Sequence, residues 1–234
     1  MNADPAAIAD QLIARQEEIL GQHENPLLRL ARTGRADRRN LRRMVQAVLL
    51  CMESEIVAYA VLLARFPRGA AGALFAELNS TLRALKPGLE ACAQALGALP
   101  LVPADPARAD GAFSFPLAVS WMGLHAEPAA AALALRADFA AYARDCRELV
   151  GALTDAGTGV PEEFRAYYDM SEPARLLTLA AAAVKEGLRR GDDPERAVSV
   201  SNLLMSGLHA FWRFAAEAGQ PSSAVEAVPH GRRV

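Results

Sequence analysis

The chain lacks several features that would narrow its chemistry at once. Only three cysteines occur in 234 residues, at Cys51, Cys92 and Cys146, and none forms a CxxC pair. Their wide spacing excludes a disulfide framework or a cysteine zinc site, and it favours a reduced, cytoplasmic setting. Aromatic residues make up 6% of the chain and β-branched residues are sparse, whereas alanine and leucine are abundant. This composition predicts an all-α protein.

Signals for export, membranes and polyanions are also missing. The first residues contain no basic segment followed by an apolar one, so we expect no signal peptide. No uncharged apolar run reaches about 18 residues, so we expect no membrane span. The formal net charge of −2 argues against a general polyanion binder.

Metal and nucleotide motifs are equally scarce. The four histidines are scattered, and no Glu-x-x-His or His-x-x-x-Asp spacing occurs on a helical segment. There is no phosphate-binding loop, no GxGxxG and no nucleophile elbow. We therefore expect no metal and no cofactor.

Proline, glycine and helix-capping residues divide the chain into eight or nine helices in one domain, residues 1–219, followed by a disordered tail, residues 220–234. The pattern predicts interruptions near Asn79 and at Pro87, and a linker over residues 100–111. The expected helices cover residues 5–22, a short stretch after 26, 37–67, 70–99 with those interruptions, 113–124, 127–153, 161–168, 171–191 and 192–219.

The segment 37–67 carries an acidic residue where the helical periodicity places an apolar face. Glu55 falls in the stripe, one turn from Cys51 on one side and Tyr59 on the other. A carboxylate there is costly unless it is paired or protonated, and burial would raise its pKa into the range of acid–base chemistry. The alternative is a structural acid hydrogen-bonded to a tyrosine or arginine of another helix.

A second acid, Asp138, lies at the edge of the apolar face of the segment 127–153. Tyr142 follows one turn later and Cys146 one turn after that. If this stripe faces that of Glu55, the two form one polar spot in an apolar interior, which is typical of small-molecule sites. Alternatively, Asp138 bonds Tyr142 or the backbone and only fixes packing.

Other candidates are weaker. His209 falls on the polar face of its helix and is interpreted as solvated, whereas the mid-helix Gly207 could allow close helix contact or leave room for a ligand. Tyr167 could edge a pocket. The seven arginines of residues 29–43 form a basic patch that lacks interleaved aromatic residues, so we interpret it as a solvated helix face and expect no nucleic-acid partner.

Several segments together resemble the TenA/PqqC group, within the heme-oxygenase-like helical fold. The stretch NPLLRLARTGRADRRNLRRMV resembles the group's opening, with Asn25 in place of its histidine. AEPAAAALALRADFAAYARDCREL followed by EFRAYYDMSEPARL resembles its central helix and the turn after it, and FWRFA resembles its terminal motif. The resemblance covers about residues 25–219 and implies a multi-helix bundle with an apolar central cavity, and a homodimer.

The resemblance also implies a rebuilt site. Val48 and Cys51 stand where thiamin-degrading members of the group bind the pyrimidine with an aspartate and a tyrosine. Asp138 stands at the nucleophilic cysteine, Tyr142 keeps the group's tyrosine, and Leu208 stands at about the terminal glutamate. Thiaminase activity is therefore not expected.

The leading hypothesis is a metal-free enzyme that acts on a small, largely apolar or aromatic metabolite, in a tailoring step of a biosynthetic pathway. Glu55, Asp138 and Tyr142 are the predicted catalytic residues. The predicted substrate contacts are Val48, Cys51, Tyr59, Cys146, Leu208 and Phe211. A non-catalytic protein that binds a small molecule or a partner is the alternative hypothesis, and DNA-binding regulation is a third, which predicts affinity that falls steeply with salt.

Overall fold

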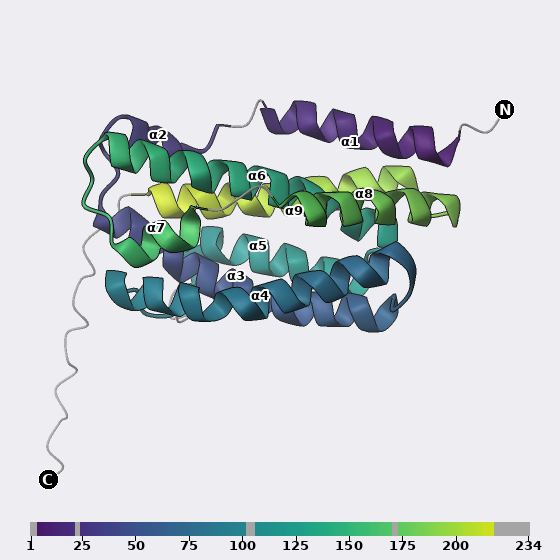
Figure 1. The fold of residues 1–234 in the computed structure, drawn as a ribbon, viewed down its shortest axis with the longest axis horizontal. Helices are drawn as coiled ribbons and strands as arrows, with labels where there is room; N and C mark the ends of the chain where they lie inside the picture. Colours follow the sequence, from purple (N-terminus) through teal and green to yellow (C-terminus); the bar gives the residue numbers. More distant parts are fainter. Residues whose placement is uncertain (1–3, 22–23, 102–105, 170–172, 218–234) are drawn as a thin grey trace, which may run out of the picture.

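The computed structural model describes residues 4–21, 24–101, 106–169 and 173–217, which form nine helices and no strand (Figure 1). The prediction of an all-α protein is confirmed. The predicted tail, residues 220–234, lies outside the described residues. The helices are α1 Pro5–Gly21, α2 Pro26–Arg32, α3 Arg38–Arg65, α4 Gly69–Leu96, α5 Pro106–His125, α6 Pro128–Asp155, α7 Glu162–Tyr168, α8 Ala174–Arg189 and α9 Pro194–Ala216.

Several helices begin where a short polar side chain caps the first turn. Asn25 accepts hydrogen bonds from the backbone N–H groups of Leu27 and Leu28, and Asp193 accepts one from Glu195. Asp37 and Asn40 form a reciprocal capping box at the start of α3. These bonds satisfy N–H groups that have no partner within the helix, which fixes where each helix begins.

Three predicted features of the helix pattern are wrong: the interruptions near Asn79 and at Pro87, and the extent of the linker over residues 100–111. α4 runs without interruption through Asn79 and Pro87. The Asn79 side chain donates to the carbonyl of Ile56 on α3 and accepts from Arg83, so it does not compete for its own backbone. Pro87 lies on the exposed face, and the buried side chains of α4 hold the helix together around it. α5 begins at Pro106, inside the predicted linker, because proline is compatible with a first helical turn.

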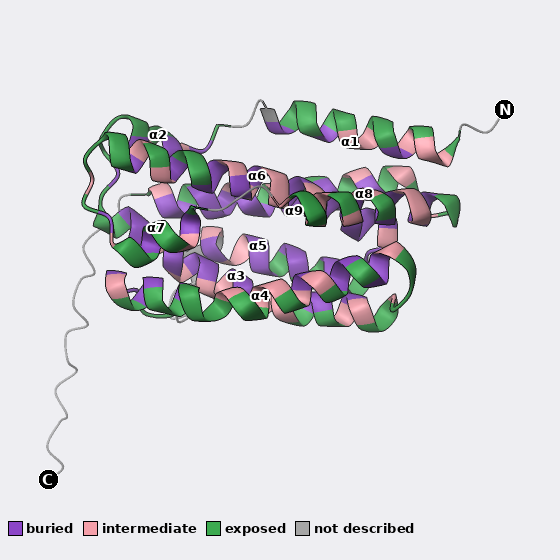
Figure 2. Ribbon diagram, in the orientation of Figure 1, coloured by how far each residue is buried: buried purple, intermediate pink, exposed green. Residues whose placement is uncertain are grey.

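Six of the helices pack in a closed ring. α3 packs against α4 and α5, α9 packs against α5 and α6, and α8 joins α6 to α4. Figure 2 shows buried residues concentrated on the surfaces that these helices turn toward one another. The expected close contact at Gly207 is present: a Cβ there would lie 2.9 Å from the Cα of Phe115, so the glycine lets α9 approach α5.

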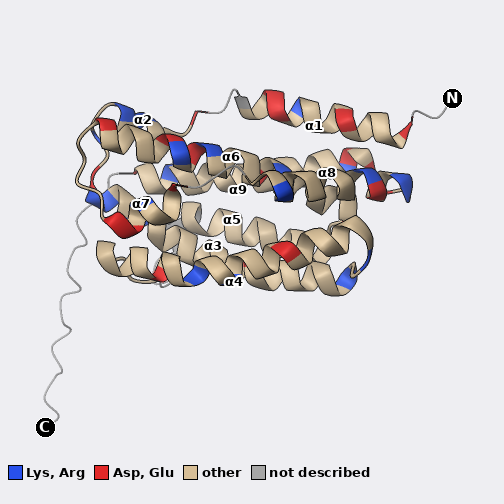
Figure 3. Ribbon diagram, viewed as in Figure 1, with Lys and Arg blue, Asp and Glu red and all other residues tan. Residues whose placement is uncertain are grey.

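The arginine patch at residues 29–43 caps other helices. Arg38 and Arg42 donate to carbonyls of Ala95 and Leu96 at the end of α4, and Arg43 donates to Phe214 near the end of α9. Helix C-termini carry unpaired carbonyls and partial negative charge, so cations stabilise them. Much of the patch therefore has a structural role, although parts of it are exposed as predicted. Figure 3 marks the lysine and arginine positions on the ribbon.

Acidic side chains in and just after α8 cap the N-termini of other helices. Glu186 accepts from the N–H of Ala70 at the start of α4. Asp192 accepts from the N–H of Ala129 at the start of α6 at 2.8 Å. These bonds satisfy two helix ends that have no capping side chain of their own.

α3 also meets the length and composition of a membrane-spanning helix, alone among the described helices. Apolar core helices of bundles satisfy the same criterion, and this one packs against α4, α5 and α9. The expectation of no membrane partner and a cytoplasmic location stays a prediction.

Candidate functional site

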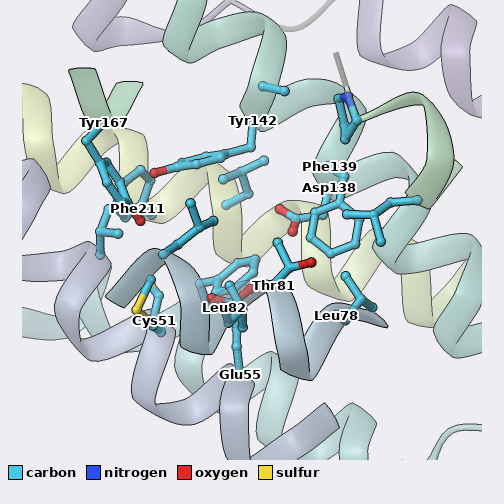
Figure 4. Close-up of a pocket in the computed structure, with 18 residues that line it drawn as sticks. Cys51, Glu55, Leu78, Thr81, Leu82, Asp138, Phe139, Tyr142, Tyr167 and Phe211 are labelled. Atoms are coloured by element: carbon cyan, nitrogen blue, oxygen red, sulfur yellow. The ribbon is translucent and has the colours of Figure 1, made fainter. Parts of the chain in front are cut away.

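A pocket of about 120 Å³ lies among the helices of the ring (Figure 4). Residues from α3, α4, α5, α6, α7, α8 and α9 line it, and its wall is overwhelmingly apolar. Seven of the nine residues predicted from the sequence line this pocket: Val48, Cys51, Glu55, Asp138, Tyr142, Leu208 and Phe211. Tyr59 and Cys146 are fully buried behind the wall.

Glu55 reaches the pocket from α3. It is partly buried, and its remaining accessible surface faces the pocket that it lines. Its Oε1 accepts a hydrogen bond from the Tyr59 hydroxyl at 2.8 Å. Burial raises the pKa of Glu55 to about 7, and the bond from Tyr59 opposes that rise. At neutral pH this carboxyl is therefore close to half protonated and can either accept or donate a proton.

Asp138 approaches the pocket from α6 and is 4% exposed. Figure 4 shows its carboxyl directed into the pocket. Burial raises the pKa of Asp138 well above its usual value, and the charge of Glu55 raises it further. Within the described ranges no hydrogen bond to its carboxyl is present, so the alternative in which Asp138 bonds Tyr142 does not match the geometry.

Tyr142 extends from α6 across the pocket and stacks on Trp212 of α9, with ring centroids 5.7 Å apart. Its hydroxyl approaches Cys146 and Tyr168 without a hydrogen bond of normal geometry to any described residue. Burial raises the pKa of Cys146 well above its usual value, and the nearby Tyr142 hydroxyl offsets this in part. The Tyr142 hydroxyl is enclosed by protein atoms, and a buried hydroxyl without an acceptor carries a free-energy cost that a hydrogen bond to a ligand would relieve.

The cysteines are poor nucleophiles in this setting. Burial raises the pKa of Cys51 well above its usual value, and the carboxyls of Glu55 and Asp138 add to the effect. Burial likewise raises the pKa of Cys92 to about 12. All three thiols are free and buried. Because the thiolate is the reactive form, the pocket offers carboxyl chemistry rather than thiol chemistry.

Several lining residues were missed by the sequence analysis. Thr81 and Leu82 lie on the part of α4 that was predicted to be interrupted, and Phe115 lies on the buried face of α5. No local pattern distinguishes them from ordinary core residues. Tyr167 on α7, noted above as a possible pocket edge, does line the pocket.

His209 lies away from this pocket. It is partly buried and lines a second, more polar pocket between α1, α6 and α9, together with Arg213 and Ser201. Its interpretation as a solvated histidine does not match this partly buried position. Among the described residues, no group of three or more histidine, cysteine or acidic side chains is arranged to hold a metal ion.

No protein-family model matches the chain, and no curated protein matches it. The assignment to a family therefore depends on the motif resemblance and is a proposal.

Proposed function

We propose that the protein is a metal-independent enzyme that performs acid–base chemistry on a small, largely apolar or aromatic metabolite bound in the Glu55–Asp138 pocket. The single observation that carries the proposal is the presence of two carboxyls in an otherwise apolar pocket, where no described residue supplies a cation that would make them a structural ion pair. A structural acid is expected to have a cation or a hydrogen-bond donor from another element as its partner. Among the described residues, Glu55 accepts a hydrogen bond from Tyr59 of its own helix, and none donates to Asp138.

The two carboxyls would have different roles. Glu55, with a pKa of about 7, accepts the substrate proton or returns it. Burial and the charge of Glu55 raise the pKa of Asp138 and so favour its protonated form, which can donate a hydrogen bond or a proton to a developing anion. Tyr59 orients the Glu55 carboxyl, and the unpaired Tyr142 hydroxyl contacts the substrate.

We further propose that the chain is a divergent TenA/PqqC-like protein with the heme-oxygenase-like fold, that the pocket is the fold's central cavity, and that the reaction is a tailoring step in biosynthesis. The occurrence of the resembling motifs in the same order along the chain supports this. So does the lining of one pocket by the residues at the group's site positions: Val48, Cys51, Asp138, Tyr142 and Leu208. We also propose a homodimer. The exposed residues Leu117, Trp121 and Leu124 form an apolar stripe on α5, with exposed Leu203 of α9 beside the first two.

The first experiment is native mass spectrometry of the purified protein. Denaturation then releases any bound small molecule, whose identification gives the compound to assay. The expected result is an organic molecule whose turnover falls by about 10²–10⁴-fold in Glu55→Gln and Asp138→Asn, because a positioned acid or base contributes that much. Glu53→Gln, an exposed acid two residues away, is the matched control. Unchanged turnover in both pocket variants, with circular dichroism unaltered, would reject the catalytic assignment.

The alternative is a non-catalytic protein that binds a small molecule or a partner on the same scaffold. The observation that favours it is the lack of a reactive nucleophile, since every described cysteine is buried with a raised pKa. A bound molecule that is never converted would support this alternative. The engagement of Arg38, Arg42 and Arg43 with helix carbonyls supports the proposal that nucleic acid is not a partner.

A further inference from the structure

The pocket contains negative or neutral acids and no positive group. Among the described residues that line it there is no lysine, arginine or histidine, and no cation contributes to the pKa of Glu55 or of Asp138. The remaining described titratable groups near the pair are Cys51 and Tyr59 of α3, Tyr142 and Cys146 of α6, and Tyr167 of α7. The wall residues contributed by α4, α5, α8 and α9 do not titrate.

We propose that the pocket binds an apolar molecule carrying one protonated amine, with the ammonium placed between Glu55 and Asp138. This inference rests on the proposed function to the extent that it takes the same pocket as the ligand site. It specifies the substrate class as a small hydrophobic amine.

Charge balance supports a single amine. Two carboxyls in one apolar pocket disfavour simultaneous ionisation, and the charge of Glu55 raises the pKa of Asp138 beyond the effect of burial. The pair then presents about one negative charge, which one ammonium neutralises. An ammonium buried without a counter-ion would be strongly disfavoured, and an anionic ligand would be repelled.

The aromatic side chains fit the same ligand. Phe115, Phe139, Tyr142, Tyr167 and Phe211 line the pocket from four helices. Their faces attract cations, and they also provide an apolar surface for an alkyl or aryl body. Figure 4 shows Phe139 beside Asp138, with Tyr142 and Tyr167 toward the other end of the pocket. The amine would therefore sit at the acids while its apolar part extends along the rings.

Binding of an amine should release a proton. The ammonium favours the ionised form of Glu55, so affinity rises with pH until Glu55 is already ionised in the free protein, above about pH 7. Below that pH the linkage predicts at most about a tenfold loss of affinity per pH unit. A neutral ligand would show the opposite trend or none.

Three probes of matched shape test the inference by calorimetry on the full chain at pH 6 and pH 8: 2-phenylethylamine, 2-phenylethanol and 3-phenylpropanoate. We expect the amine to bind at least about tenfold more tightly than the alcohol at pH 8, and the carboxylate to be the weakest. Glu55→Gln and Asp138→Asn should each reduce the preference for the amine to within about threefold. Glu53→Gln, on the exposed face of α3, is measured as the control and should leave the preference for the amine unchanged.

Three outcomes would overturn the inference: equal affinity for amine and alcohol, a preference for the amine that survives in the Glu55→Gln/Asp138→Asn double variant, or no binding of any probe. These outcomes are separable from failure of the proposed function. Selective amine binding without turnover of any amine leaves this inference standing and rejects the enzyme. Turnover of a neutral compound that depends on Glu55 supports the enzyme and rejects the amine as its substrate class.

Discussion

Glu55 and Asp138 impose an energetic cost on the folded protein. Burial raises the pKa of Glu55 from 4.5 to about 7, because the ionised form loses its hydration. The folded state therefore binds more protons than the unfolded state between these two values. The contribution of Glu55 to the free energy of unfolding is therefore most favourable at low pH. It falls as the pH rises toward 7, by up to about 3 kcal/mol. Natural chains retain such costs at sites of function.

Replacing Glu55 by glutamine should remove this pH dependence. At pH 8 we expect Glu55→Gln to be more stable than the parent chain by about 1–3 kcal/mol, because no charge is then buried. At pH 5 the gain should be much smaller, since Glu55 is already protonated there. Urea denaturation at the two pH values measures the difference.

The control for this experiment is Glu53→Gln, whose side chain is exposed on the same helix. It should change the free energy of unfolding by less than about 0.5 kcal/mol at either pH. An equal effect of Glu55→Gln at pH 5 and pH 8 would contradict the raised pKa.

Tyr59 lowers the pKa of Glu55 through one hydrogen bond. The hydroxyl donates to Oε1 at 2.8 Å and opposes the rise in the pKa of the carboxyl. In Tyr59→Phe the pKa of Glu55 should therefore rise above 7, as followed by the side-chain carbon shift in NMR titration. Tyr168→Phe, which removes another buried hydroxyl outside the contacts of Glu55, should leave it unchanged. A downward shift in Tyr59→Phe would refute the assigned role.

At the scale of the helix, small residues decide how close neighbouring elements come. A Cβ at Gly207 would lie 2.9 Å from the Cα of Phe115, and one at Gly123 would lie 3.1 Å from the Cα of Ala58. α5 thereby approaches both α9 and α3, which places Phe115 in the pocket wall. Helix propensity alone would favour alanine at these positions, so close packing has overridden it.

Alanine substitutions at two helical glycines should therefore have opposite effects. Gly207→Ala should destabilise the protein by about 1–3 kcal/mol, because backbone atoms of α5 must move. Gly151→Ala on α6 meets no atom within 4 Å, and it should stabilise by about 0.5–1 kcal/mol through helix propensity. Thermal and urea unfolding measure both. Equal effects would indicate that the α5–α9 contact carries no energy.

At the scale of the whole molecule, the apolar stripe of α5 is the surface most suited to self-association. Leu117 is 68% exposed and Leu124 is 60% exposed, at a spacing that keeps both on one helix face with Trp121. Light scattering after size-exclusion chromatography should give the mass of two chains. Leu117→Glu should shift the population to monomer, because a charge in an apolar interface is disfavoured.

Leu99→Glu is the matched control for the dimer, since Leu99 is equally exposed but lies after α4, away from the stripe. It should leave the mass unchanged. A monomeric parent chain, or a dimer that persists in Leu117→Glu, would exclude the α5 face as the interface.

The sequence by itself determined the helical class, most helix ends and the two unusual acids. These are local properties: periodicity shows Glu55 on an apolar face, and short polar side chains cap the helices that follow them. Only the tertiary structure decided that Glu55 and Asp138 share a pocket, that α4 continues past Pro87, and that arginines of the basic patch cap other helices. Each of these depends on contacts between residues far apart in the chain, and local pattern does not specify which helix faces another.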